Sequence, residues 1–390
     1  MRVALMVLVL LTAGCISGSE YQSQGQDFRM PAQNECSGNG TVPLASPMHL
    51  DDIGMIIPMG DMIGSHVTPI DHMYFSPAVF HSPPDTYNVY ADADGVIAGI
   101  GREPLSPENQ YDKYRIEIRH TCDFYSIYNL LTSLSENITT VTGTIEPGSY
   151  SNKPIHVKKG DLLGKIGGQT LDLSVNYDEV VLSGFIVPEH YAGESWKIHT
   201  VDPFDYFEEP ARTQLLAKNL RQVEPFGGKI DYDIDGRLVG NWFVEGSGGF
   251  PARYVEDSWK NHLSFAYDPI DPTHIVVSIG NYEAPEKNRP TDATQLQYGV
   301  RGNAPDPKDV SVTTGLVKYE LVGSEYVLGS EEPWDHTSYA SDIKAVSGDI
   351  VRGVVLVQLT SDRKLKFETF PGASAAQVDG FTGNALTYER

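Results

Sequence analysis

The stretch YNVYADADGVIAGIG, residues 87–101, decides the fold class of this chain. Apolar residues flank the turn-forming letters DADG on both sides, a pattern typical of two strands joined by a tight turn. Two more stretches have the same character: YRIEIRHTC (114–122) alternates strictly, and IHVKKGDLLGKIGG (155–168) has a turn at KKGD. The pattern predicts short strands joined by turns.

Composition extends this prediction to the whole chain. The 390 residues include 37 glycines, 25 prolines and 21 tyrosines, as expected of many short strands. With 40% hydrophobic residues, the chain is long enough for two domains, each with its own core. The stretches 228–246, 262–280 and 348–370 form a second set of predicted antiparallel strands. We therefore predict a mainly β protein whose C-terminal part is a β-barrel or sandwich.

One helix is expected between the two parts. In EEPARTQLLAKNLRQVEP (208–225), acidic residues and Pro210 fit a helix N-terminus, and one face would carry Leu215, Leu216, Leu220 and Val223. The predicted organisation is a first domain over 46–205, a connecting helix over 206–224 and a second domain of unknown type over 225–390.

The N-terminus reads as a processing signal. In MRVALMVLVLLTAGCISGSE (1–20), one arginine precedes an apolar run too short to span a bilayer, and small residues precede Cys15. The segment resembles a lipoprotein signal peptide (1–15) with LTAGC as its lipobox, followed by a flexible tether over 16–45. That implies lipidation of Cys15 and an extracytoplasmic protein anchored to a membrane in the cell envelope. An ordinary secretory signal cleaved nearby is the alternative.

Charge and cysteines add two predictions. The 52 acidic and 29 basic residues give a net charge of −23, which repels phosphate backbones, so no nucleic-acid partner is expected. Cys36 and Cys122 are the cysteines left after Cys15, and in an oxidising compartment such a pair is expected to form a disulfide.

Several segments together resemble a known enzyme family. They are SHVTPID (65–71), ADADGVIAGIG (91–101), YRIEIRH (114–120), IYNLL (127–131), HVKKGDLLGKIGG (156–168) and TLDLSV (170–175). Their order over residues 50–178 resembles the lysostaphin-type, LytM-like zinc endopeptidases, which cut peptidoglycan cross-bridges. The resemblance implies that the first domain is an antiparallel β-sandwich of the LytM-like endopeptidase type.

The resemblance also implies a metal site, but a degenerate one. His66 stands at the first ligand position and Asp71 at the second, although four residues separate them where the family has three. Asp172 stands at the third ligand position. Thr170 stands where the family has one catalytic histidine, and Leu130, or Ser133 if the register slips, stands where it has the other. One imidazole and two carboxylates suit calcium, magnesium or manganese better than zinc, so the resemblance implies one divalent metal ion as the cofactor.

The remaining histidines are not expected to complete the site. His120 ends an alternating strand on its apolar face, which predicts a hydrogen-bonded core residue, whereas His72 and His81 are expected on solvated loops. The choice between strand and helix stays open for residues 124–134, because their apolar residues also satisfy helical spacing.

Two functions follow from these features. The missing catalytic imidazoles favour an envelope lipoprotein that is not an enzyme and binds a cell-wall polymer or an envelope protein. The alternative is a metal-dependent hydrolase of envelope peptides or glycans that uses His66, Asp71 and Asp172.

Overall fold

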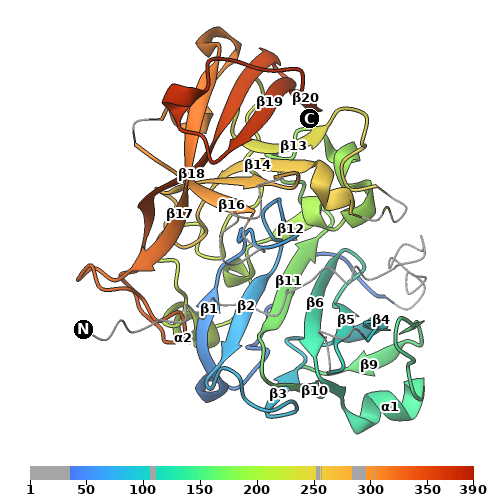
Figure 1. Ribbon diagram of the computed structural model, residues 1–390. Coiled ribbons are helices and arrows are strands. Elements are labelled where there is room, and N and C mark those ends of the chain that lie inside the picture. The colour runs from blue at the N-terminus through green and yellow to red at the C-terminus, as the bar shows by residue number, and fades with distance from the viewer. Residues whose placement is uncertain (1–35, 106–110, 252–254, 256, 283–295, 303) are drawn as a thin grey trace.

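The computed structural model describes residues 36–105, 111–251, 255, 257–282, 296–302 and 304–390. The protein is mainly β, as predicted, with 37% strand and 13% helix. Cys15 and the signal peptide lie outside the described residues, so lipidation remains a prediction. Figure 1 shows a lower unit coloured blue to green and an upper unit coloured yellow to red.

The lower unit is built on a nine-stranded antiparallel sheet. Its main path runs β1-β2-β11-β6-β5-β4-β8, while β12 pairs with β11 and β9 pairs with β4. The strands are β1 (Ile53–Ile57), β2 (Met73–Pro77), β4 (Gly95–Arg102), β5 (Tyr114–Arg119), β6 (Phe124–Leu131), β8 (Tyr150–Ser151), β9 (Ile155–Val157), β11 (Leu171–Tyr177) and β12 (Thr200–Val201).

A smaller sheet of three strands completes this unit. It has the order β3 (Tyr87–Tyr90), β10 (Leu162–Ile166) and β7 (Ser133–Leu134), and helix α1 (Glu136–Thr142) follows β7. The turns at DADG and KKGD do not close hairpins, because β3 and β10 lie in one sheet while β4 and β9 lie in the other. One hydrophobic cluster contains residues from both sheets, including Val89 and Leu163 from the small sheet and Phe75 and Ile116 from the large one.

The structure shows the conformation of two segments about which the sequence made predictions, residues 124–134 and 206–224. Residues 124–131 form strand β6, so the strand reading of that segment is right. The connecting helix predicted over 206–224 is wrong in extent, because α2 covers Ala211–Leu216 only. Beyond it, the Leu220 amide donates to the Ile56 carbonyl, and the Ile56 amide donates to the Lys218 carbonyl. The Asn219 side chain donates to the carbonyls of Arg221 and Phe226. The chain here pairs with the first sheet instead of continuing the helix.

The upper unit is a closed antiparallel barrel, which resolves the choice between barrel and sandwich. Alternate residues point inward and fill it, among them Leu263, Phe265, Val355 and Val357. In barrel order, the strands are β13 (Gly240–Val244), β14 (His262–Tyr267), β15 (Ile275–Ile279), β16 (Gln297–Val300), β17 (Val317–Val327), β18 (Lys344–Ser361), β19 (Lys364–Pro371) and β20 (Leu386–Glu389).

The two units pack directly against each other. One mixed cluster joins Met55 and Tyr74 of the lower unit to Ile270 and Trp334 of the upper one. The Gln297 side chain also donates a 3.3 Å hydrogen bond to the Gly64 carbonyl. The loop before β2 is therefore held between the units.

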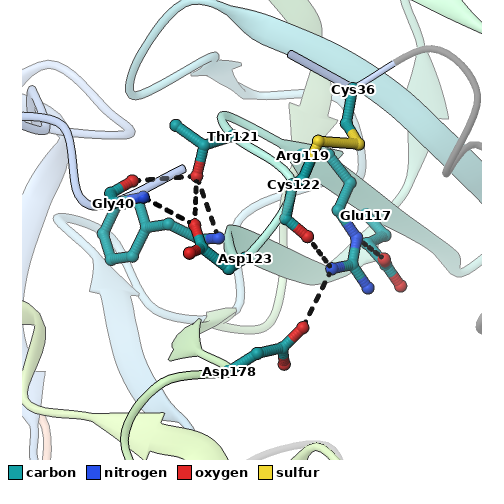
Figure 2. Close-up of a disulfide and its surroundings, with 9 residues drawn as sticks. Cys36, Gly40, Glu117, Arg119, Thr121, Cys122, Asp123 and Asp178 are labelled. Carbon is teal, nitrogen blue, oxygen red and sulfur yellow. Dashed lines mark hydrogen bonds and ion pairs between the residues drawn. A yellow bond between two sulfur atoms is a disulfide. The ribbon is translucent and has the colours of Figure 1, made fainter. Parts of the chain in front are cut away.

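The predicted disulfide between Cys36 and Cys122 is present, with Cα atoms 5.0 Å apart (Figure 2). It ties the start of the described chain to the turn between β5 and β6. Beside it, the Gly40 amide donates to Asp123 Oδ1 at 2.8 Å, and the Thr121 hydroxyl donates to the Gly40 carbonyl at 2.8 Å. Residues 36–45, predicted as the end of a flexible tether, therefore contact the lower unit, and Leu44 is fully buried.

Candidate functional site

The carboxylates predicted as metal ligands lie on either side of one histidine, His72. His72 immediately precedes β2, and Asp172 is on β11, whose residues pair with those of β2 (Leu173 with Met73, Asp172 with Tyr74). The His72 ring therefore lies diagonally across the strand pair from Asp172, within reach of its side chain. His72 Nδ1 is 3.1 Å from Asp71 Oδ1, and Nε2 is 3.4 Å from Asp172 Oδ2.

The other carboxylate oxygens also have donors. The Trp196 indole donates a 2.7 Å hydrogen bond to Asp71 Oδ2, and the Thr170 hydroxyl donates a 2.8 Å hydrogen bond to Asp172 Oδ1. Thr170, which replaces a family histidine, thus supports Asp172. Three of the four carboxylate oxygens thus accept hydrogen bonds from protein donors, while Asp172 Oδ2 has the 3.4 Å ion-pair contact with His72 Nε2.

The electrostatics of this cluster follow from burial and charge. Burial alone would lower the pKa of His72, but Asp172 and Asp71 together raise it above its ordinary value, which favours the cationic imidazole. The pKa of Asp71 is lowered, because Lys197, His72 and Trp196 outweigh the effect of burial. Burial raises the pKa of Asp172 to about 6, against the opposing influence of His72 and Thr170. A cation between two carboxylates compensates their buried charge.

As they lie, the predicted ligands do not fit a metal ion. A catalytic metal site needs several converging ligand atoms and an open position for water. Here the carboxylate oxygens are engaged with protein donors, and no hydrogen bond or ion pair joins His66 to Asp71 or Asp172 among the described residues. Within the described part of the chain, no group of three or more His, Cys, Asp and Glu side chains is arranged to hold a metal. The three-ligand site stays a prediction that these contacts do not support.

His66 faces a cavity instead. The cavity has a volume of about 160 Å³ and is lined by Ser65, His66, Val67, Thr68, Glu194, Lys197, Phe250, Ser258, Trp259 and His262. Burial lowers the pKa of His66 to about 4, and the positive charges of His72 and Lys197 add to that effect. The imidazole is therefore neutral at physiological pH, and it lies beside the carboxylate cluster, not within it.

The expectations for the remaining histidines have mixed outcomes. His120 is a hydrogen-bonded core residue, as predicted: its Nδ1 bonds the Asp94 carbonyl at 3.0 Å, and its Nε2 lies 2.9 Å from Ser126 Oγ and 3.2 Å from Asp92 Oδ1. His81 is exposed, as expected of a loop residue. His72 does lie on the loop before β2, but the prediction that it is solvated is wrong, because the pairing of β2 with β11 places its ring between two carboxylates.

Sequence reasoning missed His72, Trp196 and Lys197. Trp196 and Lys197 lie 125 residues or more after Asp71, and no local pattern connects them to it. The adjacent Asp71-His72 pair at the start of a strand was the one available signal, because an acidic neighbour favours a cationic histidine.

No protein-family model matches the chain, and no curated protein matches it. The class of protein is therefore defined by its own geometry: a two-sheet β unit and a closed eight-stranded β-barrel packed against each other. No helix in the described ranges is both long and apolar enough to cross a bilayer.

Proposed function

We propose that the protein is a lipid-anchored component of the cell envelope that binds a cell-wall polymer and does not cleave it. Its first unit resembles the LytM-like endopeptidases in the order of its sequence segments. One observation carries the proposal: Asp71 and Asp172 are bridged by His72 and hydrogen-bonded by Trp196 and Thr170. Carboxylate oxygens engaged in this way are not free to bind a catalytic metal ion, which supports a binding role over a hydrolytic one.

The position that would supply a general base supports the same proposal. Leu130 stands where the family has a catalytic histidine, and it is buried. Its φ of +70° is unusual for a leucine, and its carbonyl accepts a hydrogen bond from the Gln169 side chain. A hydrocarbon side chain cannot transfer a proton, and general acid–base help is typically worth about 10²–10⁴-fold in rate.

The first test is a cleavage assay. Purified protein is supplied in turn with zinc, manganese and calcium, and incubated with glycyl-rich peptides and cell-wall fragments. We expect no metal-dependent cleavage. Cleavage that requires a metal and disappears in His66→Ala would overturn the proposal in favour of the hydrolase.

The second test is binding. The wild-type protein is expected to co-sediment with insoluble cell-wall polymer. A protein that stays entirely in the supernatant at low salt would contradict the proposed function.

A further inference from the structure

The cavity at His66 is built from three segments that are distant in the chain. One is the loop before β2, which supplies Ser65 and Thr68. The second is the pair of 3-10 helices Pro188–Glu194 and Lys197–His199, and the third is the barrel side with Phe250, Trp259 and His262. Ligand sites occur preferentially at such boundaries between packed units. At about 160 Å³, the cavity far exceeds the roughly 10–15 Å³ that one water needs.

The charged groups of the cavity largely cancel. Lys197 Nζ and Glu194 Oε2 form an ion pair at 3.3 Å, and the lysine side chain is only 5% exposed. An ammonium has three donors, and among the described residues Glu194 is its one hydrogen-bond acceptor. The Glu194 side chain is 35% exposed and keeps accepting capacity. The pair therefore offers a donor and an acceptor side by side with little net charge.

The two imidazoles of the cavity add uncharged polar groups. Burial lowers the pKa of both His66 and His262 to about 4, so each ring is neutral near pH 7. A neutral imidazole has one donor and one acceptor nitrogen. His262 Nε2 bonds the Gly249 carbonyl at 3.2 Å, whereas His66 has no side-chain hydrogen bond to any described residue. The partly exposed His66 ring can therefore offer a donor or an acceptor to a ligand in the cavity.

Aromatic rings form the apolar part of the lining. Phe250 packs against the His262 ring with centroids 4.5 Å apart, which fixes its position. Trp259 is only partly buried, and the Lys260 ammonium lies 5.6 Å from its ring centroid. A flat ring beside paired donors and acceptors is suited to a ligand with one apolar face and several polar edges.

We propose that this cavity binds an uncharged saccharide unit. The inference rests on the proposed function, since a cell-wall polymer supplies such units. Sugar hydroxyls both donate and accept, so they match the Lys197–Glu194 pair, the free His66 ring and the hydroxyls of Ser65, Thr68 and Ser258. The C–H face of a pyranose ring packs on an indole such as Trp259 by burying apolar area.

Charged ligands fit the same cavity less well. An acidic sugar or a phosphate would compete with Glu194 for Lys197 and would meet a chain of net charge −23. A cation would meet the Lys197 ammonium. An uncharged ligand meets neither penalty.

The test is a titration of the purified protein, followed by calorimetry and tryptophan fluorescence. The probes are chitotriose and maltotriose as neutral oligosaccharides, trigalacturonic acid as an acidic one, and pentaglycine as a peptide. We expect a neutral oligosaccharide to bind, and the acid and the peptide to bind at least about tenfold more weakly. Tighter binding of trigalacturonic acid or pentaglycine, or no binding of either neutral probe up to its solubility limit, overturns the proposal.

Matched variants test the assignment to this cavity. Glu194→Gln and Trp259→Ala are each expected to weaken neutral-oligosaccharide binding by about tenfold or more, the effect typical of losing one charged hydrogen bond or one stacked ring. Glu189→Gln, on the same 3-10 helix but exposed, and Tyr111→Ala, an exposed ring elsewhere, are expected to bind like wild type. Unfolding midpoints check that each variant folds. Unchanged affinity in well-folded Trp259→Ala overturns the assignment.

The two proposals fail in different ways. If both cavity variants still co-sediment with cell-wall polymer as wild type does, the saccharide site is wrong while the proposed function stands. If wild type does not co-sediment, the proposed function is wrong, and the titration with soluble oligosaccharides still decides the cavity independently.

Discussion

At the scale of single residues, His72 supplies the positive charge that two buried carboxylates require. Asp71 and Asp172 are 8% and 3% exposed, and a buried carboxylate is costly unless a cation or several donors compensate it. The histidine ring reaches both, one with each nitrogen. A side chain of the protein thus performs the charge compensation that a metal ion performs in many acidic sites.

Replacing this histidine therefore has a predictable cost. We expect His72→Ala to reduce the free energy of unfolding by roughly 3 kcal/mol, because it leaves two largely buried carboxylates without their cation. Chemical denaturation monitored by tryptophan fluorescence measures this loss. His81→Ala, at an exposed histidine, is the control and should change stability by less than about 0.5 kcal/mol. Equal effects of the two substitutions would show that the cluster does not stabilise the fold.

A second residue, Asp268, makes the stability of the folded protein depend on pH. Burial raises the pKa of Asp268 from 3.8 to about 7, against hydrogen bonds from the Asp271 amide, the Tyr326 hydroxyl and the Ile270 amide. The folded state thus holds this proton more tightly than the unfolded chain does. The resulting stability is fully present below pH 3.8, the unfolded value, and is lost as the pH rises to about 7.

Asp268→Asn removes this titration. Between about pH 4 and pH 7.5, the free energy of unfolding of wild type should fall relative to the variant by on the order of 4 kcal/mol. Denaturation curves of both proteins at several pH values measure the difference. A difference that stays constant across this range would refute the assignment.

The candidate site was only partly predictable from sequence. His66, Asp71 and Asp172 are identified by the order of segments, and the latter two do meet at one cluster. The sequence did not predict that His72 joins the two carboxylates, because this contact depends on which strand pairs with β2. His66 faces a cavity whose other walls come from residues more than 125 positions later in the chain. No local spacing encodes such a meeting.

At the scale of elements, the alternating sequence pattern predicted the positions of the strands better than it predicted which strands pair in a sheet. The strands on either side of DADG and KKGD are present, yet each turn leads from one sheet to the other. A turn fixes local geometry, whereas sheet membership depends on contacts far along the chain. The connecting helix failed for the same reason, since the segment after Leu216 pairs with β1.

Strand β20 closes the barrel and can be tested with one pair of substitutions. Tyr388 is 1% exposed in the barrel core, while its near neighbour Leu386 is 39% exposed. We expect Tyr388→Ala to cost about 3–5 kcal/mol of stability by leaving a large cavity. Leu386→Ala, on the same strand, should cost less than about 1 kcal/mol. Thermal denaturation followed by circular dichroism compares the two, and similar losses would argue against closure by this strand.

The Cys36–Cys122 disulfide is a second feature that is expected to stabilise the fold. It closes a loop with a sequence separation of 86 residues, which corresponds to about 4.6 kcal/mol in the chain-entropy model. A Cys36→Ser/Cys122→Ser variant is therefore expected to unfold at a clearly lower denaturant concentration. Wild type in excess dithiothreitol is the matched comparison and should approach the variant. An unchanged midpoint in both would contradict a stabilising role.

At the scale of the whole molecule, the proposed anchor makes a prediction about partitioning. A chain with a net charge of −23 has little electrostatic attraction to anionic membranes, so acyl chains on Cys15 would have to hold it there. In a detergent phase-separation assay, we expect full-length protein from its native envelope in the detergent phase and Cys15→Ser in the aqueous phase. Wild type found only in the aqueous phase would exclude lipidation.

The position of the disulfide also determines how tension would travel through an anchored molecule. A pull arriving at Cys36 passes through the sulfur atoms directly to Cys122, in the turn between β5 and β6 (Figure 2). Residues 37–121 are bypassed, and they include β1 to β5 and the loop that carries His66 and His72. Load carried along the covalent chain would therefore enter beside the middle of the large sheet and would bypass the loop that carries His66 and His72.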